Sequence, residues 1–107
     1  MKRYTGCRTE HGVTVTVDEV RLNPRLDLRN HSPTGFEWGY GGSGPAQLAL
    51  AILADHLAND AKALADYQNF KWHVVANLPL EGWTLSSAEI EGVLRRLAET
   101  GGDGDGQ

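Results

Sequence analysis

Glycines cluster between residues 39 and 44, immediately before an apolar run, and this pattern could form an anion-binding site. A helix that starts here would present free backbone N–H groups at its positive end, where phosphate, a nucleotide or another anion can bind. The pattern is not a Walker loop, because Pro45 follows the last glycine and no lysine lies between Lys2 and Lys62. An anion-binding module is therefore one interpretation, and a turn that needs glycine conformations is the other. The candidate anion-binding residues are Gly41, Gly42, Ser43 and Gly44.

Catalytic and metal-binding patterns are weak in this chain. The four histidines have neither the HxxxH nor the HxH spacing of metal ligands, and Cys7 is not paired with any of them at such a spacing. Ser43 lacks the glycine two residues later that a nucleophile elbow requires. A triad of Ser43, a histidine and Asp55 can be drawn, but three such residues can be drawn in most sequences. We therefore expect no enzymatic activity, no metal and no cofactor.

Aromatic residues alternate within the same glycine-rich region, at Phe36, Trp38 and Tyr40. In an extended segment this spacing directs all three rings to one side. They could cover the central helix, or they could form a protein-binding surface, since Trp and Tyr are favoured interface anchors. With Arg25 and Arg29 shortly before them, base stacking is a third interpretation. We place core packing first, a protein-binding surface second and nucleic acid third, and the protein-binding candidates are these five residues.

The charge distribution restricts the class of partner. The net charge is −4, which argues against nucleic acid. Residues 1–30 carry six basic and four acidic side chains, a net of +2, whereas the remainder carries four basic and ten acidic ones, a net of −6. This asymmetry could steer a protein partner toward the chain.

Cysteine usage and hydropathy indicate the compartment. The single cysteine excludes an intrachain disulfide, and the first residues have no apolar stretch of the kind found in signal peptides. The longest apolar run, residues 48–54, is too short to span a bilayer. We therefore expect a cytoplasmic protein without membrane association, and the sequence leaves its oligomeric state open.

Strand patterns dominate the first part of the chain. Residues 13–17 alternate Val and Thr, which predicts a strand, and residues 4–8 are expected to form the strand before it. A short returning strand should follow residues 18–19, Asp-Glu, which suit a two-residue turn poorly because its second position usually requires glycine. We therefore expect a distorted or longer turn. Residues 25–29 predict a further extended segment, and residues 83–85 a short extended link.

Helix patterns follow, beginning with a run that is apolar nearly all round and should form the central helix. Its N-cap should be Ser43 or Gly44, with Pro45 in the first turn. Asp60 can cap a second helix that ends near residue 77, where Trp72 lies off the apolar stripe and is expected to contact another element.

A capping box starts the last helix, because Ser86 is followed by Glu89 at the required spacing. Strands followed by three helices favour an α+β fold, with an N-terminal antiparallel β-sheet of three to four strands and three α-helices packed on one face. We expect one domain over residues 1–100 and a disordered tail over residues 101–107.

The block HSPTGFEWGYGGSGPAQLALAILADHL, with the opening YTGCRTEHGVTVTV and the closing FKWHVV and GWTL, resembles a family of small uncharacterised proteins. The resemblance extends from Tyr4 to about Leu97, and the glycine-rich block is its specific part. That family occurs in bacteria, their phages and other mobile elements. The resemblance therefore implies a cytoplasmic protein of mobile-element type and supplies no activity.

These observations lead to two functional expectations. The first is a non-enzymatic phage or mobile-element accessory protein that binds a host or phage macromolecule, for example as an inhibitor of a host defence system such as an anti-CRISPR. The second is a small-molecule or anion-binding module, for nucleotide or phosphate, that uses the glycine-rich helix N-terminus.

Overall fold

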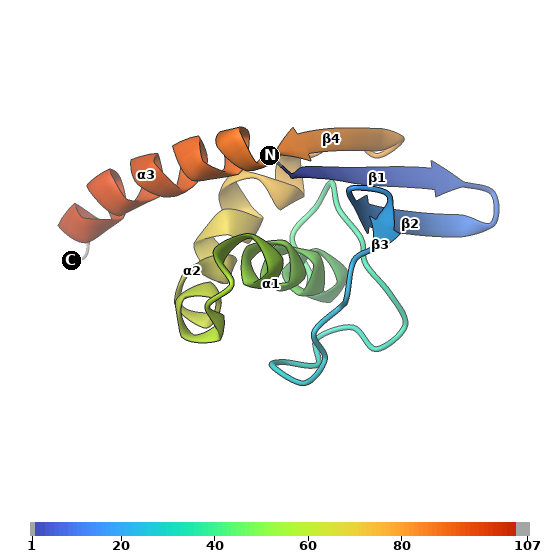
Figure 1. Cartoon of the computed structure of the whole chain (residues 1–107), viewed down its shortest axis with the longest axis horizontal. Helices are drawn as coiled ribbons and strands as arrows, with labels where there is room; N and C mark the ends of the chain where they lie inside the picture. Colours follow the sequence, from blue (N-terminus) through green and yellow to red (C-terminus); the bar gives the residue numbers. More distant parts are fainter. Residues whose placement is uncertain (1, 105–107) are drawn as a thin grey trace.

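The computed structural model describes residues 2–104, which fold into an antiparallel sheet and a helical layer (Figure 1). This confirms the predicted α+β class. Figure 1 shows α1 and α2 on one side of the sheet, whereas α3 leads away from the end of β4. The elements in chain order are β1 (Arg3–Thr9), β2 (Gly12–Val17), β3 (Val20–Arg21), α1 (Ser43–Leu57), α2 (Asp60–His73), the 3-10 helix η1 (Val75–Asn77), β4 (Gly82–Ser86) and α3 (Ser87–Gly104).

The sheet has the strand order β3-β2-β1-β4, so β1 lies inside it and β4 lies at one edge. Alternation along the strands sends Tyr4, Val15 and Trp83 to the face that the helices cover, and all three are buried. Thr14 and Thr84 lie on the opposite face and are exposed. Helices α1 and α2 therefore cover one face of the sheet (Figure 1).

The turn between β2 and β3 is tight, which corrects the expectation of a distorted or longer one. Val17 pairs directly with Val20, and both turn residues adopt positive φ, 49° at Asp18 and 72° at Glu19. Positive φ at both positions is the requirement of the two-residue hairpin turn that matches strand twist. The Asp18 carboxylate accepts a hydrogen bond from Arg3 N at 2.9 Å, and Asp18 N donates to Arg3 O at 2.9 Å. These bonds to β1 hold a conformation that glycine would adopt more easily.

The fourth strand is not where the sequence pattern placed an extended segment. Residues 25–29 are not extended, because Arg25 has a φ of 54° and its carbonyl accepts from Leu28 N at 3.0 Å, which closes a turn. Residues 83–85, expected to be a link, lie within β4 and pair with β1. Pairing there buries Trp83 against the core, and local alternation could not reveal that partner.

The core is built around α1, whose residues from Gly44 to Ala54 are all buried. Alpha-helix α2 packs along it through Ala63, Tyr67 and Phe70. The predicted N-caps, Ser43 or Gly44 for α1 and Asp60 for α2, are wrong, because each lies one or two residues after the observed cap. Gly42 precedes α1 without a side-chain cap, and Asn59 caps α2, accepting from Lys62 N at 3.1 Å.

The predicted capping box at the start of α3 is confirmed. Ser86 Oγ accepts from Glu89 N at 3.1 Å, and Glu89 Oε1 accepts from Ser86 N at 2.8 Å. The helix continues to Gly104, later than the sequence indicated. Residues 105–107, the end of the tail expected to be disordered, lie outside the described residues.

Candidate functional site

Three large apolar side chains converge on the main chain of residues 39–42. A Cβ on Gly39 would collide with the Leu80 side chain, and a Cβ on Gly41 would collide with the Trp72 ring. A Cβ on Gly42 would lie 2.9 Å from Tyr40 Cε2. The glycines are therefore needed for close approach of side chains to backbone, and Gly39 also has a φ of +88°.

These three side chains remain exposed although they pack on the glycines. The exposed fraction is 49% for Tyr40, 56% for Trp72 and 53% for Leu80. Lys71 Nζ lies 4.1 Å from the centroid of the Trp72 ring, which fixes one face of that ring by a cation–π contact. We call Tyr40, Trp72 and Leu80 the aromatic patch. Its members are three of the five large hydrophobic residues that are exposed in the described part of the chain, and sequence reasoning found only Tyr40 among them.

The three alternating rings do not share one face, which corrects the expectation drawn from their spacing. Trp38 is fully buried, its Nε1 donates to Pro79 O at 2.8 Å and Leu80 O at 3.1 Å, and its ring meets the Trp83 ring edge to face at 5.6 Å. Phe36 is half-buried against the core, and Tyr40 is in the aromatic patch. The chain turns at residue 39, where positive φ ends the period of two.

An ion pair ties the strand β1 to the segment before the patch. Arg8 Nη2 lies 2.6 Å from Glu37 Oε1, and Arg8 Nε donates to Leu80 O at 2.8 Å. The hydrogen bond from Arg8 holds the pKa of the Glu37 carboxyl below its usual range. Arg8 also lies over the Trp38 ring at 4.9 Å. This residue therefore fixes the position of Leu80 and of the chain that leads into the aromatic patch.

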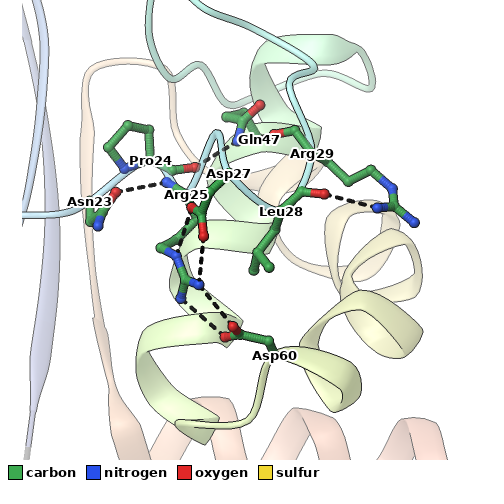
Figure 2. A network of polar contacts seen from close by, with 8 residues as sticks. All are labelled: Asn23, Pro24, Arg25, Asp27, Leu28, Arg29, Gln47 and Asp60. Atoms are coloured by element: carbon green, nitrogen blue, oxygen red, sulfur yellow. Dashed lines mark hydrogen bonds and ion pairs between the residues drawn. The ribbon is translucent and has the colours of Figure 1, made fainter.

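Arg25, a predicted protein-binding residue, is occupied by contacts within the molecule (Figure 2). Its guanidinium donates to both carboxylate oxygens of Asp27, each at 3.1 Å, and to both of Asp60, at 3.1 and 2.9 Å. The hydrogen bonds from Arg25 lower the pKa of Asp27. Arg29 is exposed, and its guanidinium donates to Leu28 O at 2.8 Å. Arg25 thus fastens residues 23–29 to the start of α2, and neither arginine lies in the aromatic patch.

Gln47 is a buried polar residue that the sequence reasoning missed. Its amide nitrogen donates to Pro24 O at 2.6 Å and Arg29 O at 3.0 Å, as Figure 2 shows. Its amide oxygen accepts from His31 N at 2.8 Å and Ser32 N at 3.1 Å. All four hydrogen-bonding positions of the side chain are filled, so Gln47 connects α1 to the loop before it. The available signal was an amide beside an otherwise apolar run, since a buried amide needs partners.

The candidate anion-binding residues lie at the start of α1. Gly42 precedes the helix, and Ser43 is exposed in its first turn. Gly44 is buried beneath Glu37, and a Cβ on it would lie 2.7 Å from Glu37 Cβ. The Glu37 side chain therefore covers Gly44, and its carboxylate is paired with Arg8. Anion binding at Gly41, Gly42, Ser43 and Gly44 stays a prediction.

Residues 2–104 contain no group of three or more His, Cys, Asp or Glu side chains arranged to hold a metal ion. No helix in that range is both long and apolar enough to cross a membrane. Trp83 Nε1 is buried without a hydrogen-bond partner in the described part of the chain.

Comparison with known proteins gives the family and no relative of established activity. No curated protein and no solved structure matches the chain. The model of a family of unknown function, DUF6166, matches residues 4–96, which is close to the extent of the resemblance seen in the sequence. This chain belongs to the family of unknown function DUF6166.

Proposed function

We propose that the protein is a non-enzymatic accessory protein of phage or mobile-element type that binds a host or phage protein through the aromatic patch. The observation that carries this proposal is that Tyr40, Trp72 and Leu80 stay about half exposed while each packs against a glycine within residues 39–42. Contiguous exposed apolar side chains are a feature of interaction sites.

The construction of the patch supports binding rather than chance exposure. Rings that pack on glycine backbone are held in place before a partner arrives, which reduces the ordering cost of association. Trp and Tyr are also the residues most enriched among those that dominate binding free energy. Arg8 holds Leu80 through its carbonyl, so the third member of the patch is positioned as well.

The charge supports a protein partner over nucleic acid. The net charge is −4, and residues 31–107 carry four basic and ten acidic side chains. An acidic surface of this kind suits a basic partner, including a protein whose own ligand is nucleic acid. The narrower form of the proposal is therefore an inhibitor of a host defence system, such as an anti-CRISPR, that competes with nucleic acid.

A capture experiment with matched variants tests the proposal. The tagged chain is compared with Trp72→Ala and with Val20→Ala, because Val20 is 67% exposed on β3 and lies outside the patch. We expect a stoichiometric protein to be captured by the wild type and by Val20→Ala. Trp72→Ala should weaken that complex by about 30-fold, since a central aromatic anchor contributes about 2 kcal/mol or more.

Two outcomes contradict the proposal. One is the absence of any stoichiometric protein, and the other is a complex that Trp72→Ala and Val20→Ala bind equally well. The narrower form is tested separately, by adding nucleic acid to the complex. It requires that nucleic acid and this chain exclude one another on the partner.

A further inference from the structure

The two edges of the sheet are built differently. At one edge, β3 has two residues and is followed by Pro24, which has no N–H to offer to a further strand. At the other edge, β4 has five residues and nothing pairs with its outer side within residues 2–104 (Figure 1). Its sequence, GWTLS, contains no charge and no proline, the usual means by which proteins protect an edge.

The register identifies the main-chain groups that face away from β1. Arg8 N donates to Glu81 O at 3.2 Å, and Ser87 N donates to Lys2 O at 2.9 Å. Hydrogen-bonded pairs alternate along an antiparallel ladder, so Trp83 and Leu85 of β4 make the bonds to β1 between these two points. The remaining residues of the strand, Gly82, Thr84 and Ser86, direct their N–H and C=O groups outward.

Two of these three residues have both main-chain groups open. Ser86 N is used by Glu89 Oε1 in the capping box. No hydrogen bond within the described chain uses the outward N–H or C=O of Gly82 or Thr84. The edge therefore presents two donors and two acceptors, separated by one residue.

We propose that β4 pairs with β4 of a second copy of this chain, antiparallel and about a two-fold axis at Trp83. That register sets Gly82 opposite Thr84 of the second copy and Thr84 opposite Gly82 of the second copy. Both are hydrogen-bonding positions, so four N–H groups meet four C=O groups and the two four-stranded sheets become one.

The second copy is favoured over another strand for two reasons. The open groups lie symmetrically on either side of Trp83, so the edge is complementary to itself in the antiparallel direction, which is the isologous arrangement of most homodimers. The absence of charge in β4 also means that two copies bring no like charges together along the strand. The interface is small, so the association should be weak and concentration-dependent.

Amide hydrogen exchange of the intact chain tests this pairing without any substitution. The amides of Gly82 and Thr84 should become protected as protein concentration is raised about a hundredfold, because only the dimer bonds them. The amides of Trp83 and Leu85 bond to β1 and should be protected throughout. Sedimentation over the same range should show monomer passing to dimer. A monomer at every concentration overturns the inference, and so does a dimer whose Gly82 and Thr84 amides exchange freely.

A pair of substitutions at one position gives the second arm. Thr84→Pro removes an outward N–H at an edge strand, where proline is tolerated, whereas Thr84→Val keeps it. The two-fold relation removes the bond twice, so we expect Thr84→Pro to raise the dimer dissociation constant at least about tenfold. Thr84→Val should leave it unchanged. A dimer that both variants form equally well lies at another surface and overturns the inference. Circular dichroism checks that each variant folds, and the exchange data decide the matter if Thr84→Pro does not.

Discussion

Residues 23–32 and residues 39–42 are both irregular segments close to α1. They differ in whether the groups around them are bonded within the molecule or exposed to solvent. In the first segment, Gln47 and Arg25 bind the main chain and the carboxylates, so the polar groups are satisfied within the molecule. In the second, Tyr40, Trp72 and Leu80 stay about half exposed over glycine. The first segment is a structural loop, whereas the second is the surface that we propose as a binding site.

This difference shows which side chains still have binding capacity that the fold does not use. Arginine before an aromatic block is a frequent binding signal, but the Arg25 guanidinium already makes four hydrogen bonds to two carboxylates, which leaves one of its five N–H groups for a partner. An aromatic ring that packs on glycine differs from this arginine, because the glycine covers only part of the ring and leaves the rest open to a partner. Four predictions test this distinction, in order of decreasing effect.

Trp38, which precedes the glycines, and Trp72 of α2, whose ring packs on Gly41, should differ most. Trp38→Ala should lower the free energy of unfolding by about 4 kcal/mol, because it empties a buried ring site and removes a hydrogen bond to the main chain. Trp72→Ala should lower it by less than about 1 kcal/mol, because the ring is half exposed. Urea unfolding measures both. Equal losses would erase the distinction between core and surface rings.

Gln47 should prove structural rather than functional. Gln47→Leu should cost about 3 kcal/mol of unfolding free energy, since it leaves four main-chain groups without their partner in a buried place. The control is Gln68→Leu on the exposed side of α2, where we expect a change within about 0.5 kcal/mol. If both variants melt alike, the loop does not depend on the amide.

The ion pair between Arg25 and Asp27 should make the stability of the fold depend on pH. Hydrogen bonds from Arg25 lower the pKa of Asp27 from its ordinary value of 3.8. A carboxyl with a depressed folded-state pKa stabilises the fold above its unfolded-state pKa, and this contribution disappears as pH falls through the folded-state value. Arg25→Gln should therefore be less stable than wild type at pH near 7, and the difference should shrink in acid.

Arg29→Gln is the matched control for that experiment, because Arg29 is exposed and its guanidinium bonds a neighbouring carbonyl. We expect no pH-dependent difference from wild type for this variant. A difference between Arg25→Gln and wild type that stays constant from neutral to acid pH would contradict a role for the Asp27 carboxylate.

Phosphate should have the smallest effect. A bound anion at 100 times its dissociation constant would stabilise the fold by about 2.7 kcal/mol, which a thermal melt detects readily. Because Glu37 covers Gly44 at the start of α1, we expect no shift of the melting temperature with phosphate, sulfate or nucleotides. A saturable shift that Ser43→Ala or Gly44→Ala removes would instead support the anion-binding alternative.

Local patterns predicted the elements whose partners lie nearby in the sequence. The alternation at residues 13–17 and the Ser86–Glu89 capping box are confirmed because strand alternation and capping depend on adjacent residues. The role of residues 83–85 could not be read locally, since β4 exists by pairing with β1, which lies at the other end of the chain. The turn at Asp18 has the same origin, because its conformation is held by bonds to Arg3.

The candidate site was also predictable only in part, because it too depends on contacts between segments that are distant in the sequence. The glycines indicated close approach, and Trp72 was recognised as lying off the stripe of its helix, but nothing in the sequence joins the two. Trp38 and Tyr40 were assigned one face because a period of two was assumed through Gly39, where positive φ ends it. Contacts between distant segments, rather than composition, decide which ring is exposed.

The three tryptophans are also intrinsic spectroscopic probes that report separately on the core and on the surface. Trp38 and Trp83 meet edge to face at 5.6 Å in the interior, so their coupled transitions should dominate near-ultraviolet circular dichroism and disappear on unfolding. Trp72 is reached by solvent, so a collisional quencher such as iodide should act on its fluorescence first. A ligand that covers the aromatic patch would shield one emitter and leave the dichroic pair unchanged, which separates binding from unfolding in a single unlabelled sample.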